Sequence, residues 1–238
     1  MVGILLAFSV ALTPTEVLQK VDSVSTVPHS VGILEETIVT TSGSKRTFRI
    51  KYFTKDNMDK QLMVYLYPEP VAGTSFLIVG DNVWAYFPET GRTRKIASHA
   101  RRGKVMGSDF TYEDLSTTTY GKKFKPVSMK TTDNAYILEL VPRKGTHISY
   151  SKIVMTVDKS TFVPTKIDFY RKDDSKPYKT LYQSDIETVD GIPTPKTITM
   201  VNNLTGGKTV MKIVSIDYNS PIEDRFFTLE GMRGALEK

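Results

Sequence analysis

The segment SFLIVGDNVWAYF, residues 75–87, shows how this chain is built. Two short runs of β-branched and aromatic residues, 75–79 and 83–87, flank the tripeptide Gly80-Asp81-Asn82. Glycine, aspartate and asparagine favour tight turns, so such runs on both sides of a turn predict a β-hairpin. The hairpin therefore indicates a β fold.

Runs of the same kind follow on both sides of the hairpin. Strands are expected at 34–41, 46–53, 62–67, 93–97, 126–130, 136–141, 149–157, 165–170, 178–189, 196–201 and 209–218. Regular short strands with turn residues between them predict a large antiparallel sheet, a sandwich or a barrel. Since no repeat or flexible linker divides the chain, residues 13–238 are expected to form a single domain.

One helix is expected before the strands. Thr13 can cap it, Pro14 takes the first helical position and Glu16 the third, which together form a capping box. Apolar residues then recur at helical spacing, at positions 17, 18, 21 and 24. The pattern predicts a helix from about residue 14 to residue 24 that lies on a sheet by one apolar stripe.

Two of the expected strands are apolar on both faces. In 62–67, Leu62 and Val64 lie on one face while Met63 and Tyr65 lie on the other, and 209–218 has the same character. A sheet with one face in water alternates between apolar and polar residues instead. Two apolar faces need two covers, which favours a curved sheet around an apolar interior, with ordinary sandwich packing as the alternative.

The composition is that of a folded protein with an excess of positive charge. Hydrophobic residues make up 39% of the 238 residues, charged residues 24%, and the formal net charge is +6. This balance favours anionic surroundings, such as phospholipid headgroups or an acidic partner protein. The absence of cysteine excludes disulfides, thiolate metal ligands and cysteine nucleophiles.

Residues 1–12 are expected to be a signal-peptide remnant. The run 3–12 is apolar and uncharged, and it is shorter than the roughly 20 residues that span a bilayer. Ser9-Val10-Ala11 has the small-residue pattern of a cleavage site, although the usual basic start is missing. The alternative is a buried N-terminal strand or helix. A cleaved signal would place a soluble mature chain in the periplasm.

Three motifs stand in order after residue 80. They are D-x-x-W-x-Y-x-P at 81–88, R-x-R-K-I at 92–96 and MGSDFTYEDL at 106–115, and further matching segments lie at 161–170, 190–193 and 226–229. With these motifs the chain resembles the outer-membrane lipoprotein-sorting proteins, which are relatives of the LolA and LolB carriers. The resemblance covers essentially the whole chain from Thr13 on.

The resemblance implies a mainly β fold, an open curved antiparallel sheet or half-barrel with short helices covering its mouth. It implies a periplasmic carrier that binds acyl chains of lipoproteins or lipids in the apolar interior and delivers them toward the outer membrane. Its expected partners are an inner-membrane exporter and an outer-membrane acceptor, and the carrier is expected to be a monomer that binds no nucleic acid. The lack of cysteine matches the soluble carrier rather than the acceptor, while the cargo, lipoprotein or free lipid, stays open.

Candidate ligand-binding residues lie in the same motifs. Residues 108–115 have the pattern of a helix start capped by Ser108 or Asp109, with Gly103 and Gly107 as hinges of a lid. A structural plug is the alternative to the lid, and burial in the core is the alternative for the hairpin aromatics. The candidate acyl-chain and lid residues are Trp84, Tyr86, Met106, Phe110, Tyr112 and Leu115.

Basic residues follow the hairpin without an acid among them. They are candidates for contact with anionic headgroups or with an acidic partner, and a solvated loop is the alternative. The candidates are Arg92, Arg94, Lys95, Arg101 and Arg102.

The residues give little support to catalysis. The 3 histidines are scattered without metal-ligand spacing, and no G-x-S-x-G motif occurs, so no metal, cofactor or enzymatic activity is expected. The acids Asp109 and Glu113 leave a hydrolase as one alternative. A ligand-sensing or protein-interaction module of the same fold is the other.

Overall fold

The computed structural model describes residues 11–235, so that most of the expected signal-peptide stretch lies outside the described residues. The strands are β1 (His29–Val39), β2 (Lys45–Lys55), β3 (Lys60–Tyr67), β4 (Ser75–Val79), β5 (Asn82–Phe87), β6 (Arg92–Lys95), β7 (Phe124–Thr131), β8 (Ala135–Pro142), β9 (Lys152–Asp158), β10 (Pro164–Tyr170), β11 (Lys179–Val189), β12 (Ile192–Asn202) and β13 (Lys208–Asp217). The helices are α1 (Pro14–Ser25), α2 (Tyr112–Leu115), α3 (Tyr120–Lys123) and α4 (Leu229–Arg233), with 3-10 turns η1 (Glu69–Val71), η2 (Pro88–Thr90), η3 (Ser98–Arg102) and η4 (Asp224–Phe227). Every expected strand and the expected first helix are confirmed.

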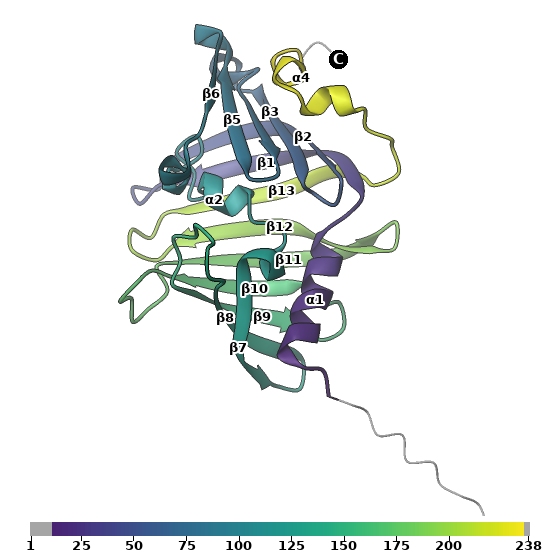
Figure 1. Cartoon of the computed structure of the whole chain (residues 1–238). Helices are drawn as coiled ribbons and strands as arrows, with labels where there is room; N and C mark the ends of the chain where they lie inside the picture. The colour runs from purple at the N-terminus through teal and green to yellow at the C-terminus, as the bar shows by residue number, and fades with distance from the viewer. Residues whose placement is uncertain (1–10, 236–238) are drawn as a thin grey trace, which may run out of the picture.

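Within residues 11–235 the strands form one 13-stranded antiparallel sheet in the order β6-β5-β4-β3-β2-β1-β13-β12-β11-β10-β9-β8-β7. Two meanders, β1–β6 and β7–β13, are joined where β1 pairs with β13. In Figure 1 the outer strands β5 and β6 of the first meander stand across the direction of β9–β13, and the sheet curves around the helices in front of it. Since β6 and β7 do not pair with each other, the sheet is open, which confirms the half-barrel.

The concave face is covered by α1, α2 and α3. Helix α1 has the expected capping box at Thr13, and Val17, Leu18 and Val21 are buried beneath it. The carboxylate of Asp22 accepts hydrogen bonds from the backbone N–H groups of Tyr120 and Gly121, at 2.7 and 2.8 Å. The helix is therefore tied to the segment that carries α3.

The two apolar faces of β3 have separate covers. On the concave face Met63 and Tyr65 belong to a core with Phe48 and Phe76. On the convex face, Leu62 and Val64 pack under the C-terminal residues Ile222, Phe227, Met232 and Ala235. The curved sheet was expected from this pattern, whereas the C-terminal cover was not.

Strand β13 contains a bulge that changes which residues face inward. The register with β1 shifts between the pairs Ile33–Ser215 and Leu34–Ile213, so that Val214 is the extra residue. Its side chain is 56% exposed, while Ile213 and Ile216 both line the interior. A bulge places residues of opposite parity on one face, which explains the two-sided pattern of this strand.

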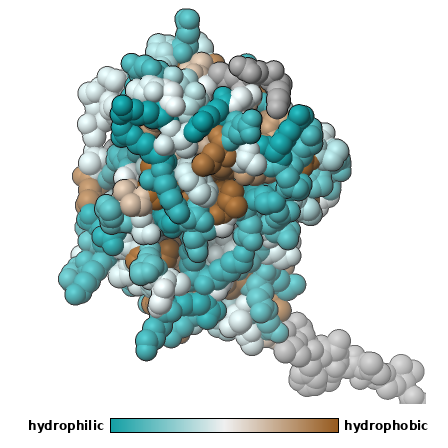
Figure 2. Space-filling model, turned by 45° about the horizontal axis from the view of Figure 1, so that its top comes forward, coloured by the Kyte–Doolittle hydropathy of each residue, from teal (hydrophilic) through white to brown (hydrophobic). Residues whose placement is uncertain are grey.

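Outside, the molecule is mainly hydrophilic. On the face drawn in Figure 2, hydrophobic surface gathers in a small area near the middle and is surrounded by hydrophilic residues. No helix between residues 11 and 235 has both the length and the apolar character needed to cross a membrane.

The C-terminal cover gives a first prediction. Phe227 is 7% exposed against β3, so Phe227→Ala should lower the free energy of unfolding by about 3 kcal/mol, measured by urea denaturation. Leu229→Ala is the control, because Leu229 is 42% exposed and should change it by less than about 1 kcal/mol. Equal effects would show that the segment does not stabilise the sheet.

Candidate functional site

A cavity of about 340 Å³ lies between the concave face and its helical cover. Strands β1–β3 and β10–β13 form its floor, and its other walls come from the end of α1 and from residues 110–124. The volume is within the range of pockets that hold small ligands. The open curvature of the sheet therefore produces a binding cavity and not merely a packed core.

The cavity wall is predominantly apolar. Four methionines contribute to it, at positions 58, 63, 200 and 211. Methionine side chains are flexible and polarizable, which suits them to ligands of variable shape. Aromatic and branched residues supply most of the remaining surface, including Phe110, Phe124, Tyr150, Phe169, Leu181 and Ile213.

Residues 104–117 of the cover include the segment 108–115, which the sequence predicted to be a lid. A short hairpin brings Lys104 opposite Thr111, and its turn places Met106 and Gly107 at φ values of 51° and 80°. The positive φ favours glycine at position 107, where the flexible guanidinium of Arg46 lies close by. Gly103 has an ordinary φ of −68°, and only Gly107 of the two expected hinges needs its conformational freedom.

Helix α2 follows this hairpin, and its cap differs from the expectation. Thr111 is the N-cap and Asp114 completes a capping box, instead of Ser108 or Asp109. The hydroxyl of Ser108 lies close to the backbone of Phe110, and Asp109 makes contacts on β13. Asp109 is thus used in a tertiary contact, which a local pattern does not reveal.

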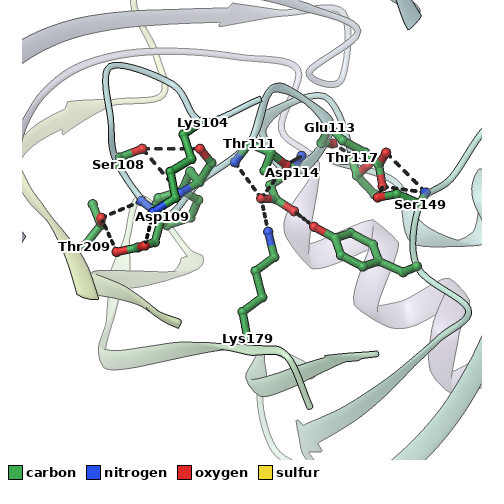
Figure 3. A network of polar contacts seen from close by, with 12 residues as sticks. Lys104, Ser108, Asp109, Thr111, Glu113, Asp114, Thr117, Ser149, Lys179 and Thr209 are labelled. Carbon is green, nitrogen blue, oxygen red and sulfur yellow. Dashed lines mark hydrogen bonds and ion pairs between the residues drawn. The ribbon is translucent and has the colours of Figure 1, made fainter. Parts of the chain in front are cut away.

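Three buried carboxylates fasten this segment to the sheet and to the loop before β9 (Figure 3). Asp114 forms an ion pair with Lys179 of β11 and accepts a hydrogen bond from the Tyr150 hydroxyl at 2.7 Å. The side chains of Lys179 and Asp114 are only 1% and 6% exposed. The ammonium of Lys179 also lies 5.1 Å from the Tyr150 ring and 5.3 Å from the Phe169 ring, which stabilises the buried cation.

The other two carboxylates flank this pair. Asp109 pairs with Lys104 at 2.8 Å and accepts a hydrogen bond from the Thr209 hydroxyl at 3.2 Å. Glu113 accepts hydrogen bonds from the backbone N–H and the hydroxyl of Ser149, at 3.0 and 2.8 Å. Because neither acid lines the cavity, the pair proposed for a hydrolase does not face a bound ligand.

The structure divides the expected acyl-chain residues into two groups. Phe110 and Leu115 line the cavity. Met106 and Tyr112 pack into the neighbouring core, where the Tyr112 ring lies 5.7 Å from that of Phe76. Trp84 and Tyr86 share a face as expected, but this face is the convex one, under the C-terminal cover. The cavity wall thus includes two of the six residues that were expected to contact an acyl chain.

The expected headgroup contacts lie away from the cavity. Arg92, Arg94 and Lys95 belong to β6, an edge strand of the sheet, and the other two lie in η3. Arg101 donates a hydrogen bond to the backbone carbonyl of Asp81. Exposed cations on an edge strand hinder pairing with another chain, so this basic edge also has a structural role.

Lys179 is the residue of the site that sequence reasoning missed. It shares a strand face with Leu181 and Gln183, both of which line the cavity. A lysine on the apolar parity of a strand was the available signal, since such a residue must be buried, paired or at a strand end. Its partner is distant in the sequence, so the pattern alone could not name Asp114.

A further buried acid lies on the concave face outside the cavity wall. Glu36 is 1% exposed, and the Tyr65 hydroxyl donates a hydrogen bond to it at 3.4 Å. Burial raises the pKa of this carboxyl to about 7, although the Tyr65 hydrogen bond and the charge of Arg46 act in the opposite direction.

Comparison with known proteins agrees with this architecture. Residues 57–234, most of the chain, match the model of a family of uncharacterized proteins. A DUF1329 family protein from Desulfovibrio piger has a similar structure, with a TM-score of 0.84 and 26% identity over 92% of this chain and 97% of its own. No curated protein matches the chain.

Two further solved structures share the fold. A Vibrio parahaemolyticus domain assigned to outer membrane lipoprotein sorting has a TM-score of 0.81 and 23% identity over 93% of this chain and 100% of its own. A LolA superfamily protein from Nitrosomonas europaea has a TM-score of 0.76 and 18% identity over 92% of this chain and 99% of its own. In each comparison almost the entire half-barrel is shared.

The buried pair gives a second prediction. Lys179→Met should lower the free energy of unfolding by about 3 kcal/mol or more, because it leaves Asp114 buried without its cation. Adding Asp114→Asn should recover part of this loss. The control is Lys122→Met, since the Lys122–Asp59 pair is 62% and 55% exposed and should contribute less than about 1 kcal/mol. A double variant no more stable than Lys179→Met would contradict the pairing.

Glu36 gives a third prediction, with a defined pH dependence. Because its pKa is raised from 4.5 to about 7, the folded protein favours the protonated acid and loses stability as the pH rises through that interval. Glu36→Gln removes this loss. The variant should therefore gain up to roughly 3 kcal/mol over the wild type between pH 4 and pH 8 in denaturant titrations. A difference that does not change with pH would show that Glu36 titrates normally.

Proposed function

We propose that this chain, which belongs to the family of uncharacterized proteins matched over residues 57–234 and shares the fold of LolA superfamily proteins, carries acyl chains in its half-barrel cavity and delivers them toward the outer membrane. It is a carrier-type domain by its fold. The observation that supports the cargo is the apolar cavity beneath residues 110–124. Burial contributes about 0.8 kcal/mol per methylene, so an acyl chain gains affinity there without any covalent step.

In this proposal, residues 104–117 act as a lid over the cavity. Phe110 and Leu115 contribute apolar surface to the wall, and the ion pair of Asp114 with Lys179 holds the closed position. A partner that stabilises an open position would release the cargo, because a ligand or partner shifts a conformational equilibrium by its preference for one state. Met106, Tyr112, Trp84 and Tyr86 would then support the lid and the sheet rather than contact the acyl chain.

The proposed setting is the cell envelope, outside the cytoplasm. Residues 1–12 would direct export and residues 13–238 would form the single carrier domain, working with an inner-membrane exporter and an outer-membrane acceptor. The basic residues of β6 and η3 are exposed enough to meet anionic headgroups or an acidic partner surface. The proposed carrier has no catalytic step, in keeping with the engaged positions of Asp109 and Glu113.

The fourth prediction tests the cargo. Native mass spectrometry of the protein purified from its expression host should show acyl lipid bound in a defined stoichiometry. Phe110→Ala and Leu115→Ala should each weaken binding of a pyrene-labelled acyl ester by roughly tenfold, because each removes apolar contact worth about 1.5 kcal/mol.

Val214→Ala is the matched control, because it also truncates an apolar side chain but lies exposed on the convex face. It should leave affinity unchanged. An unliganded mass together with no uptake of the ester would overturn the carrier proposal. Unfolding of both lid variants, with normal ligand content in the wild type, would instead identify the segment as a structural plug.

A further inference from the structure

The cavity contains almost no charge. Among the described residues that line it, Asp114 is the one aspartate, glutamate, histidine, lysine or arginine, and Lys179 already pairs with it. A charged group moved from water into an apolar cavity needs a compensating partner. The lining offers none to a ligand carboxylate, phosphate or amine.

Five neutral polar residues of the lining lie together at one end of the cavity. Neighbouring strands β3, β2 and β1 contribute Gln61, Thr54 and Ser30, which lie opposite one another in the sheet register. Beyond them, past the end of β13, the Tyr218 hydroxyl lies 2.8 Å from that of Thr194 at the start of β12. We call these five residues, all of which line the cavity, the polar row.

The groups of the polar row are neutral hydrogen-bonding groups. The hydroxyls of Ser30 and Thr54 lie 2.7 Å apart, and the Gln61 amide donates to the backbone carbonyls of Met58 and Leu115. Next to the row, Tyr52 also lines the cavity, and its hydroxyl has no hydrogen-bond partner among the described residues. Hydroxyl groups of this kind can donate to the carbonyl of an ester or amide.

The opposite end of the cavity is apolar apart from Asp114, whose charge is paired with Lys179 and whose carboxylate accepts a hydrogen bond from Tyr150. The lining follows β13 from Met211 to the residue after the strand, Tyr218, a span of about 20 Å at the usual rise per residue. Met211 lies near Phe110, Leu181 and Met200 in one hydrophobic core. An elongated ligand with one polar end therefore has a preferred direction.

From this arrangement we propose that the cargo has an uncharged polar group, an ester, amide or hydroxyl, which lies at the polar row with its acyl chains directed toward Phe110 and Met211. The inference rests on the proposed carrier function and narrows its substrate class. A lipid with an ionised headgroup keeps that headgroup outside the cavity, and its acyl chains then fill the cavity less completely. Free fatty acids are accordingly poor ligands.

The test compares three probes with the same acyl chain: oleate, methyl oleate and monooleoylglycerol. Each displaces a pyrene-labelled acyl ester from the full chain at pH 8, where a carboxyl group is ionised. We expect methyl oleate and monooleoylglycerol to bind at least about tenfold more tightly than oleate. Only oleate carries a charge, which it must either bury without a partner or keep in water by leaving part of the cavity empty.

A pair of variants tests the direction of binding. Thr194→Val combined with Tyr218→Phe should weaken monooleoylglycerol binding about tenfold, since it removes two neighbouring hydroxyls from the polar row. The matched control, Thr197→Val with Tyr182→Phe, makes the same changes at residues that do not line the cavity, and should have no effect.

The outcomes separate this inference from the carrier proposal. If methyl oleate and monooleoylglycerol bind more tightly than oleate, and only the polar-row variant reduces this preference, both the inference and the carrier proposal are supported. Oleate binding as tightly as the esters, or equal affinity of the polar-row variant and the control, overturns the inference and leaves the carrier standing. Failure of all three probes to bind overturns the carrier proposal and the inference with it.

Discussion

The structure depends on one constraint: an apolar sheet face cannot be left in water. Strand β3 carries such residues on both faces, so the chain must cover each of them. The curvature of the sheet covers one face, because it turns the concave residues toward one another and toward α1–α3 (Figure 1). The C-terminal segment covers the convex face, where its Phe226 ring stacks on Phe53 with centroids 4.9 Å apart. The cavity is the space that curvature leaves after these demands have been met.

The cover over this space is held differently from the sheet beneath it. Apolar residues of the cover such as Val105 and Phe110 are buried in the cores, and three carboxylates provide its specific attachments to β11, β13 and the 149–150 loop (Figure 3). Buried ion pairs add little net stability, because desolvation offsets much of their attraction. They do require one geometry, however, since an unpaired partner is costly. A cover fastened in this way has one defined closed position.

Much of this architecture could be predicted from local patterns. The strands and α1 follow from alternation, turn residues and a capping box, all of which operate within a few residues. The site depends on contacts between distant segments and could be predicted only in part. Trp84 and Tyr86 were placed on a common face, but the curvature of the whole sheet decides that this face is convex. Lys179 lies on the apolar parity of its strand, but the sequence pattern could not identify Asp114 as its partner. The sequence pattern suggested Asp109 as a helix cap, but Asp109 accepts a hydrogen bond from the distant Thr209, and Thr111 caps the helix instead.

The bulge at Val214 has a consequence for how the binding cavity can change over time. A single extra residue decides that Ile213 and Ile216 share the concave face, and it places Tyr218 beside Thr194. Exchange of the exposed Val214 for another residue leaves this arrangement intact. Deletion of one residue would turn everything after it to the opposite side and exchange hydroxyl groups for the residues now facing solvent. Length changes in this strand, more than substitutions, are thus the route by which related chains could acquire cargo of different polarity.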